Sequence, residues 1–98
     1  MEKRKPHHSL AEIKRLVEAG EVDFTQVALQ GALSLGMLQE DILNVVCSLT
    51  NKDFYKSMTS YADHRCWQDV YHPKTESGTI YLKLTIQNGV LILSFKEK

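Results

Sequence analysis

Hydrophobic and polar positions alternate most regularly in the last twenty residues, 79–98. In this segment Asn88-Gly89 separates two alternating runs, which is the pattern of a β-hairpin with a two-residue turn. If these two residues form the loop, paired positions have numbers that sum to 177, and Tyr81 lies opposite Lys96. The same count predicts three apolar pairs on the other face of the hairpin: Ile86 with Leu91, Leu84 with Leu93, and Leu82 with Phe95.

The first half of the chain has apolar residues at helical spacing instead. Ser9 begins a Ser-x-x-Glu capping box and predicts a helix over residues 10–19. Thr25 is a candidate cap for a second helix that ends at Gly36, and a third helix is expected from about Gln39.

The middle of the chain contains the change from helices to strands. The segment 21–24 is a link that could be extended, and Thr50 is expected to cap a short fourth helix over residues 53–59. In that helix the aromatic side chains would dock on the core while Lys56 points away. Residues 65–72 alternate and are rich in aromatic side chains, which predicts a strand, and 73–78 is a polar loop before the hairpin.

Two registers of the 65–72 strand are compatible with a six-residue loop. We favour the one that turns Trp67 and Asp69 toward the leucines and puts Gln68 on the face of Tyr81, because it buries Trp67, although Asp69 then needs a partner. The sequence therefore predicts a single α+β domain over residues 1–98, with N-terminal helices packed on a C-terminal antiparallel sheet.

Charge and composition narrow the class of protein. Twelve basic and twelve acidic residues give zero net charge, which argues against a simple polyanion binder. The charge is uneven, however: +3 over residues 1–15 (five basic, two acidic), −5 over 16–53 (one basic, six acidic) and +2 over 54–98 (six basic, four acidic). No apolar run approaches the roughly 20 residues of a membrane span, so we expect a cytoplasmic protein. Cys47 and Cys66 lack paired spacing, which favours reduced thiols.

The predicted sheet face of Tyr81 is the candidate for chemistry. Lys83 and Lys96 share this face, Gln68 comes from the neighbouring strand, and Lys56 comes from the segment before it. Lysines can hold a phosphodiester and stabilise its developing charge, while a phenol or an amine can move a proton. RNA supplies its own nucleophile, the 2′-hydroxyl, so no Ser or Cys nucleophile and no metal or cofactor is required. The alternative is a solvated sheet face whose lysines protect an edge.

Histidines offer weaker candidates. His64, Cys66 and His72 could form half of a zinc site, but their spacing matches no standard zinc pattern. His64 or His72 could instead act as a general acid or base. Gly-rich phosphate loops, nucleophile elbows and paired-carboxylate motifs are all missing from the sequence, so nucleoside-triphosphate and hydrolase-triad chemistry lack support.

Several long stretches resemble a known family. They are M-E-K-R-x-P-H at the start, D-F-Y-K-S-M-T-S-Y-A-D-H followed by W-Q-D-V-Y, and I-Y-L-K-L-T-I with V-L-I-L-S-F-K-E-K at the end. These stretches closely resemble the motility quorum-sensing regulator (MqsR) toxins, which are RelE-like mRNA interferases of type II toxin-antitoxin systems. The resemblance is weak from residue 21 to residue 50.

The resemblance implies a RelE-like fold and a ribosome-independent endoribonuclease that cuts mRNA at short GC-containing sites such as GCU or GCA. It also implies a cognate antitoxin with a zinc-binding part and a DNA-binding part, so that DNA is contacted only indirectly. Site residues proposed for the family correspond to Lys56, Gln68, Tyr81 and Lys96, and all four residue types are present.

From these residues we expect transesterification by the RNA 2′-hydroxyl. Tyr81 or Lys56 would act as the general base, Lys96 would stabilise the phosphorane, and Gln68 would orient a phosphate or a base. Three further side chains are expected to contact the substrate: Lys83, His64 and Arg65. The competing hypothesis is a non-enzymatic interaction module, or a transcriptional co-regulator that acts through a DNA-binding partner.

Overall fold

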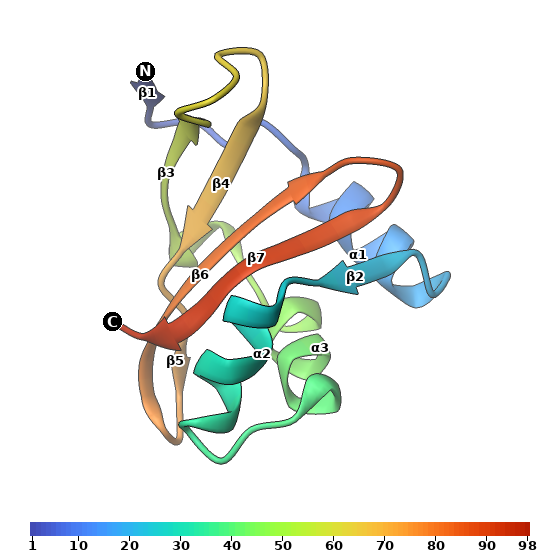
Figure 1. Cartoon of the computed structure of the whole chain (residues 1–98), viewed down its shortest axis with the longest axis vertical. Helices are drawn as coiled ribbons and strands as arrows, with labels where there is room; N and C mark the ends of the chain where they lie inside the picture. The colour runs from blue at the N-terminus through green and yellow to red at the C-terminus, as the bar shows by residue number, and fades with distance from the viewer.

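The computed structural model describes all residues, 1–98, and consists of three helices and a seven-stranded sheet (Figure 1). The helices are α1 (Leu10–Glu18), α2 (Gln26–Leu33) and α3 (Gln39–Cys47), with a short 3-10 helix, η1 (Asn51–Asp53). The strands are β1 (Glu2–Lys3), β2 (Val22–Phe24), β3 (Phe54–Thr59), β4 (Trp67–Tyr71), β5 (Lys74–Thr75), β6 (Gly78–Ile86) and β7 (Val90–Glu97).

The sheet has the strand order β1-β3-β4-β6-β7-β2, and β5 adds to β6. All pairs are antiparallel except β2 with β7, which is parallel. The predicted α+β class is confirmed. The sheet differs from the prediction because two strands of the N-terminal half, β1 and β2, extend its edges, and because β5 forms inside the predicted polar loop.

Helices α1 and α2 begin directly after their predicted caps, and α3 begins at Gln39, as expected. The Ser9 hydroxyl accepts a hydrogen bond from the Glu12 backbone N–H (3.1 Å), and the Thr25 hydroxyl accepts one from the Ala28 N–H (3.1 Å). The reciprocal half of the first capping box is not formed, because the Glu12 carboxylate binds the Arg15 guanidinium at 2.7 Å instead.

The predicted helix over residues 53–59 is wrong, since this segment forms β3. Its cap does exist: the Asp53 carboxylate accepts from the Thr50 N–H at 2.9 Å and closes the single turn of η1. Beyond that turn, pairing with β4 satisfies the backbone groups of a segment that contains Phe54, Tyr55 and Thr59, which are residue types that favour strands. Tertiary pairing therefore overrides the local helix signal.

The hairpin loop is one residue longer than predicted. Ile86 lies opposite Val90, so the loop contains Gln87, Asn88 and Gly89. Asn88 (φ 52°) and Gly89 (φ 112°) both take the left-handed conformation. Of the three predicted apolar pairs only Leu82 with Phe95 is confirmed; the other two are replaced by Ile86 with Val90 and Leu84 with Ile92.

A β-bulge in β7 compensates for the longer loop. Leu84 pairs with Ile92 and Lys83 with Ser94, which leaves Leu93 as the extra residue. From this point the numbers of paired residues again sum to 177, and the predicted pairing of Tyr81 with Lys96 is confirmed.

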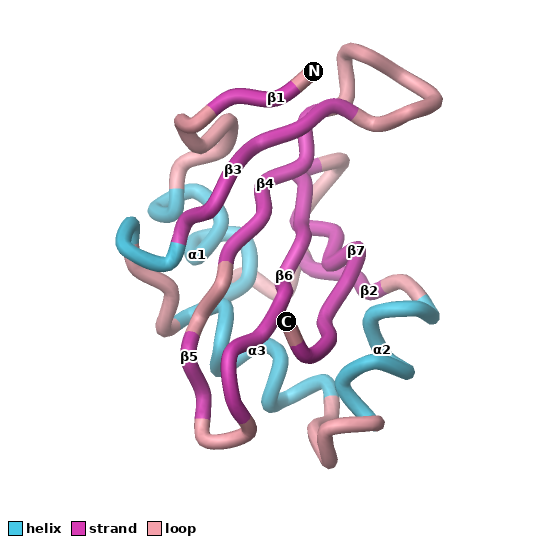
Figure 2. Tube along the Cα trace, turned by 90° about the vertical axis from the view of Figure 1, so that its left-hand side faces the viewer, coloured by secondary structure: helices cyan, strands magenta, loops and turns pink.

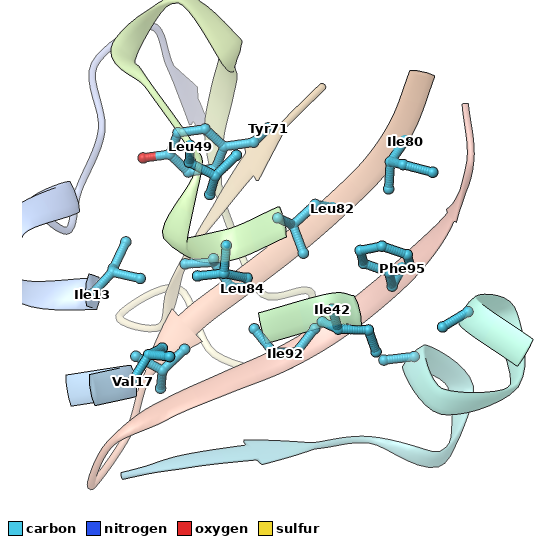
Figure 3. Close-up of a cluster of buried hydrophobic side chains, with 14 of the residues drawn as sticks. Ile13, Val17, Ile42, Leu49, Tyr71, Ile80, Leu82, Leu84, Ile92 and Phe95 are labelled. Carbon is cyan, nitrogen blue, oxygen red and sulfur yellow. The ribbon is translucent and has the colours of Figure 1, made fainter. Parts of the chain in front are cut away.

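The core lies between the helices and the sheet. Its members are buried apolar side chains from all three helices and from β4, β6 and β7, and Figure 3 labels ten of them: Ile13, Val17, Ile42, Leu49, Tyr71, Ile80, Leu82, Leu84, Ile92 and Phe95. Tyr71 pairs with Leu82 and Asp69 with Leu84, so the favoured register of the β4 strand is confirmed.

Asp69 finds its partner in the N-terminal arm, residues 1–8. Its carboxylate is fully buried and accepts hydrogen bonds from the backbone N–H groups of His7 (3.1 Å) and His8 (2.9 Å). The His7 ring in turn stacks on Trp67 with ring centres 5.4 Å apart. The buried charge is therefore satisfied by backbone donors, and it anchors the arm across β4.

Helix α2 packs closely on β7 through small residues. Ala28 and Ala32 are buried, and a Cβ atom on Gly31 would lie 2.0 Å from the carbonyl oxygen of Phe95. No side chain fits at this position unless the helix and the strand separate. Gly31 therefore sets the distance between α2 and the end of β7 that carries Lys96.

We expect Gly31→Ala to lower the free energy of unfolding by about 1–2 kcal/mol. The gain in helix propensity, about 1 kcal/mol, is outweighed by overpacking, which should cost about 2–3 kcal/mol because the 2.0 Å contact is with a backbone carbonyl. Urea unfolding measures the change, and Gln30→Ala on the exposed side of the same helix, which should change stability by less than about 0.5 kcal/mol, is the control. A Gly31→Ala protein as stable as wild type would contradict the tight contact.

Candidate functional site

The helices cover only one face of the sheet. Figure 2 views the other face, with α1 and α3 behind the strands, and we call this the open face. It carries the polar side chains that alternate with the core residues of β3, β4, β6 and β7. Five residues proposed from the sequence belong to it: Lys56, Gln68, Tyr81, Lys83 and Lys96.

Tyr81 and Lys96 form the centre of the candidate site. They are direct cross-strand partners on β6 and β7, and the Lys96 ammonium lies 5.2 Å from the centre of the Tyr81 ring. At this distance the ammonium group interacts with the ring face. The pair therefore places a phenol and a positive charge together on two rigid strands.

A row of side chains crosses the sheet beside this pair. Lys56 and Lys83 both pair with Val70, from β3 on one side and β6 on the other. Val70 is fully buried although it belongs to the open face, which indicates that the flanking lysine stems cover it. Gln68 lies further along β4, four residues from the level of Tyr81, which is roughly 13 Å at about 3.3 Å per residue.

Lys56 is held by an ion pair with the N-terminal strand. Its ammonium lies 2.8 Å from the Glu2 carboxylate, and the lysine side chain is 19% exposed. The hydrogen bond from Lys56 to Glu2 raises the pKa of the lysine and lowers the pKa of the carboxyl. Both groups are therefore charged at neutral pH, and Lys56 is suited to binding an anion rather than to accepting a proton.

Two aromatic residues also lie beside the proposed site. Tyr55 stacks on His72 with ring centres 4.4 Å apart, and His72 lies 5.8 Å from the Tyr81 ring. Burial lowers the pKa of His72. The sequence suggests His72 only as an acid, a base or a metal ligand. The helix predicted from the sequence turns Tyr55 toward the core. In the structure Tyr55 is instead the extra residue of a β-bulge between Phe54 and Lys56, and its side chain is exposed.

His64 and Arg65 are not brought to this group. They lie in the loop between β3 and β4, where the Arg65 side chain is exposed and pairs with Asp63 at 3.3 Å. This loop joins the Trp67 end of β4, whereas His72 follows the other end, about 17 Å away at about 3.3 Å per residue. The structure therefore also separates His64 and Cys66 from His72, and no group of three or more His, Cys, Asp or Glu side chains is arranged to hold a metal ion.

The fold and the open face define a small α+β protein with three lysines and a tyrosine grouped on the exposed face of its sheet. The chain matches the family described as "Motility quorum-sensing regulator, toxin of MqsA" over residues 5–97. It is 52% identical over 98 residues, the full length of both chains, to the Escherichia coli (strain K12) protein named mRNA interferase toxin MqsR. The chain therefore belongs to the MqsR toxin family, and the resemblance noted in the sequence is confirmed. None of its helices is long and apolar enough to cross a membrane.

We expect Glu2→Gln to lower the pKa of Lys56, because the substitution removes the negative charge that stabilises the ammonium form. Side-chain NMR of the lysine across a pH titration measures this change. The control is Glu12→Gln, which removes the same charge from the ion pair with Arg15 on α1 and should leave Lys56 unaffected. A Lys56 pKa that is the same in Glu2→Gln and wild type would show that the ion pair does not persist in solution.

Proposed function

We propose that this toxin is an endoribonuclease that cuts mRNA at short GC-containing sites such as GCU or GCA, without a metal ion. The observation that carries the proposal is the pairing of Tyr81 with Lys96, next to Lys56 and Lys83, on the open face of a sheet. The name of the full-length relative, an mRNA interferase toxin, agrees with this activity and with the enzyme class expected from the sequence. Cationic side chains on a fixed scaffold suit a phosphodiester.

In the proposed reaction the 2′-hydroxyl of the RNA attacks the adjacent phosphorus. The phenolate form of Tyr81 takes the hydroxyl proton, the new O2′–P bond forms, and the bond from phosphorus to the 5′-oxygen breaks. The leaving 5′-oxygen takes a proton from water, so the products are a 2′,3′-cyclic phosphate and a 5′-hydroxyl. Tyr81 is preferred to Lys56 as the base because the ion pair with Glu2 favours the protonated lysine.

The remaining residues of the proposed site bind the RNA or stabilise the transition state. Lys96 neutralises the charge that develops on the phosphorane, while Lys56 and Lys83 hold the phosphate from the neighbouring row. Gln68 lies far enough along β4 to contact a flanking nucleotide rather than the reacting phosphate. Each role is a proposal based on position in the sheet and on the chemistry of the side chain.

We expect Tyr81→Phe and Lys96→Ala to fold normally and to lose about 10²- to 10³-fold in cleavage rate, because each removes a proton acceptor or a stabilising charge. The assay uses a GCU-containing RNA with EDTA present and identifies the product ends. Tyr61→Phe and Lys52→Ala, which remove the same groups from exposed positions elsewhere, are the matched controls. Intact RNA with wild-type protein would favour the interaction module, and cleavage only with added metal would exclude the mechanism.

The family pairs this toxin with an antitoxin. We infer that the cognate antitoxin has a zinc-binding part and a DNA-binding part, and that the toxin reaches DNA only through it. Expression of the chain alone should arrest growth, and co-expression of the antitoxin should restore growth. In a gel-shift assay with operator DNA the purified toxin should give no shift, whereas the complex should. A shift with toxin alone would contradict indirect binding.

A further inference from the structure

The ion pair between Glu2 and Lys56 differs from the other ion pairs of the protein. The pairs Glu12 with Arg15 and Asp63 with Arg65 join residues three and two positions apart. Glu2 and Lys56 are 54 positions apart and meet only because β1 adds to the edge of β3. The N-terminal strand therefore brings a carboxylate onto the open face, beside a lysine of the proposed site.

The backbone of β1 holds this carboxylate in place. Glu2 lies opposite Met58, and the Met1 carbonyl accepts a hydrogen bond from the Thr59 N–H at 2.9 Å. The N-terminal amine also donates to the Thr59 hydroxyl at 3.2 Å. The Glu2 side chain itself is 53% exposed. The strand can therefore stay paired while the carboxylate rotates away from Lys56.

Lys56 has much less freedom than its partner. Its side chain is only 19% exposed, its stem lies beside Val70, and its ammonium lies 5.4 Å from the Tyr55 ring centre. An RNA phosphate must therefore bind the Lys56 ammonium at its present position on the open face. Carboxylate and phosphate oxygens are both anionic acceptors for a lysine, and two anions on one ammonium repel each other. The carboxylate occupies the position that a phosphate would need.

We propose that the Glu2 carboxylate occupies, in the free toxin, the position on Lys56 that an RNA phosphate takes in the complex, so that Glu2 limits the affinity for RNA. This inference rests on the proposed function, because it deepens the account of the same site. Glu2 is a positioning residue: it acts through Lys56 and does not contact the reacting atoms. The N-terminal strand is thereby part of the RNA-binding surface.

The test compares RNA binding by wild type, Glu2→Gln, Lys56→Gln and the double variant. The probe is a GCU-containing RNA with 2′-deoxy nucleotides at the GCU, which lacks the nucleophile and stays intact, and fluorescence anisotropy gives Kd. We expect Glu2→Gln to bind roughly two- to five-fold more tightly, the range expected for release of an exposed ion pair. In the Lys56→Gln background the same substitution should give no such gain.

Controls separate this inference from a general charge effect and from the proposed function. Glu12→Gln adds the same net charge on α1 and should leave Kd unchanged. Three outcomes would each overturn the inference while wild type still cleaves ordinary GCU-containing RNA. The first is an equal gain in affinity in Glu2→Gln and Glu12→Gln, and the second is a gain in affinity that persists in the Lys56→Gln background. The third is RNA binding by Glu2→Gln that is unchanged or weaker than that of wild type. If wild type neither binds nor cleaves RNA, the proposed function fails and this inference fails with it.

Discussion

The bulge at Leu93 is the constraint on which both the core and the candidate site depend. Gly89 lies close to the Glu21 backbone, so that a Cβ atom on Gly89 would be 2.8 Å from the Glu21 carbonyl oxygen. The hairpin loop at this point contains three residues. If the register set by that loop continued, Tyr81 would face Phe95, and Leu82 would face Ser94. The extra residue moves the pairing by one position, so that apolar side chains again meet on the core face and Tyr81 meets Lys96.

A single threonine ties this bulge to the helical layer. The Thr25 hydroxyl donates to the Leu93 carbonyl at 2.9 Å and accepts from the Ala28 N–H at 3.1 Å, using its one donor and one of its acceptor sites. The cap of α2 therefore also satisfies the backbone group that the bulge leaves out of the ladder. Gly31, two turns along α2, brings the same helix against the Phe95 carbonyl. Lys96 is thus positioned by a helix that contributes no side chain to the open face.

The parts of the fold that could be predicted are those with a strong local signal. The Ser9 and Thr25 caps place two helices, and residue alternation places the strands that pair Tyr81 with Lys96. The predicted pairing of Tyr81 with Lys96 is nevertheless reached through a wrong loop. The longer turn shifts the register by one residue and the bulge shifts it back, and neither feature has a signature in the sequence of the hairpin. Tyr55 is misplaced for a related reason: a cap closes one turn of helix, but pairing with β4, which is remote in sequence, decides the conformation of the next six residues. The Glu2 contact depends on an edge strand of two residues, too short to show any period.

The net charge of this protein is a poor guide to how charge is distributed over its surface. Charge counted along the chain gives zero, yet the sheet separates charges by face. Lys56, Lys83 and Lys96 share the open face, while Asp69 on β4 points to the opposite side, where backbone N–H groups donate hydrogen bonds to it. Among these lysines only Lys56 is paired with a carboxylate, and that partner comes from the exposed side chain of an edge strand. A chain with zero net charge can therefore still present three lysines together on one face of its sheet, with a single carboxylate paired to one of them.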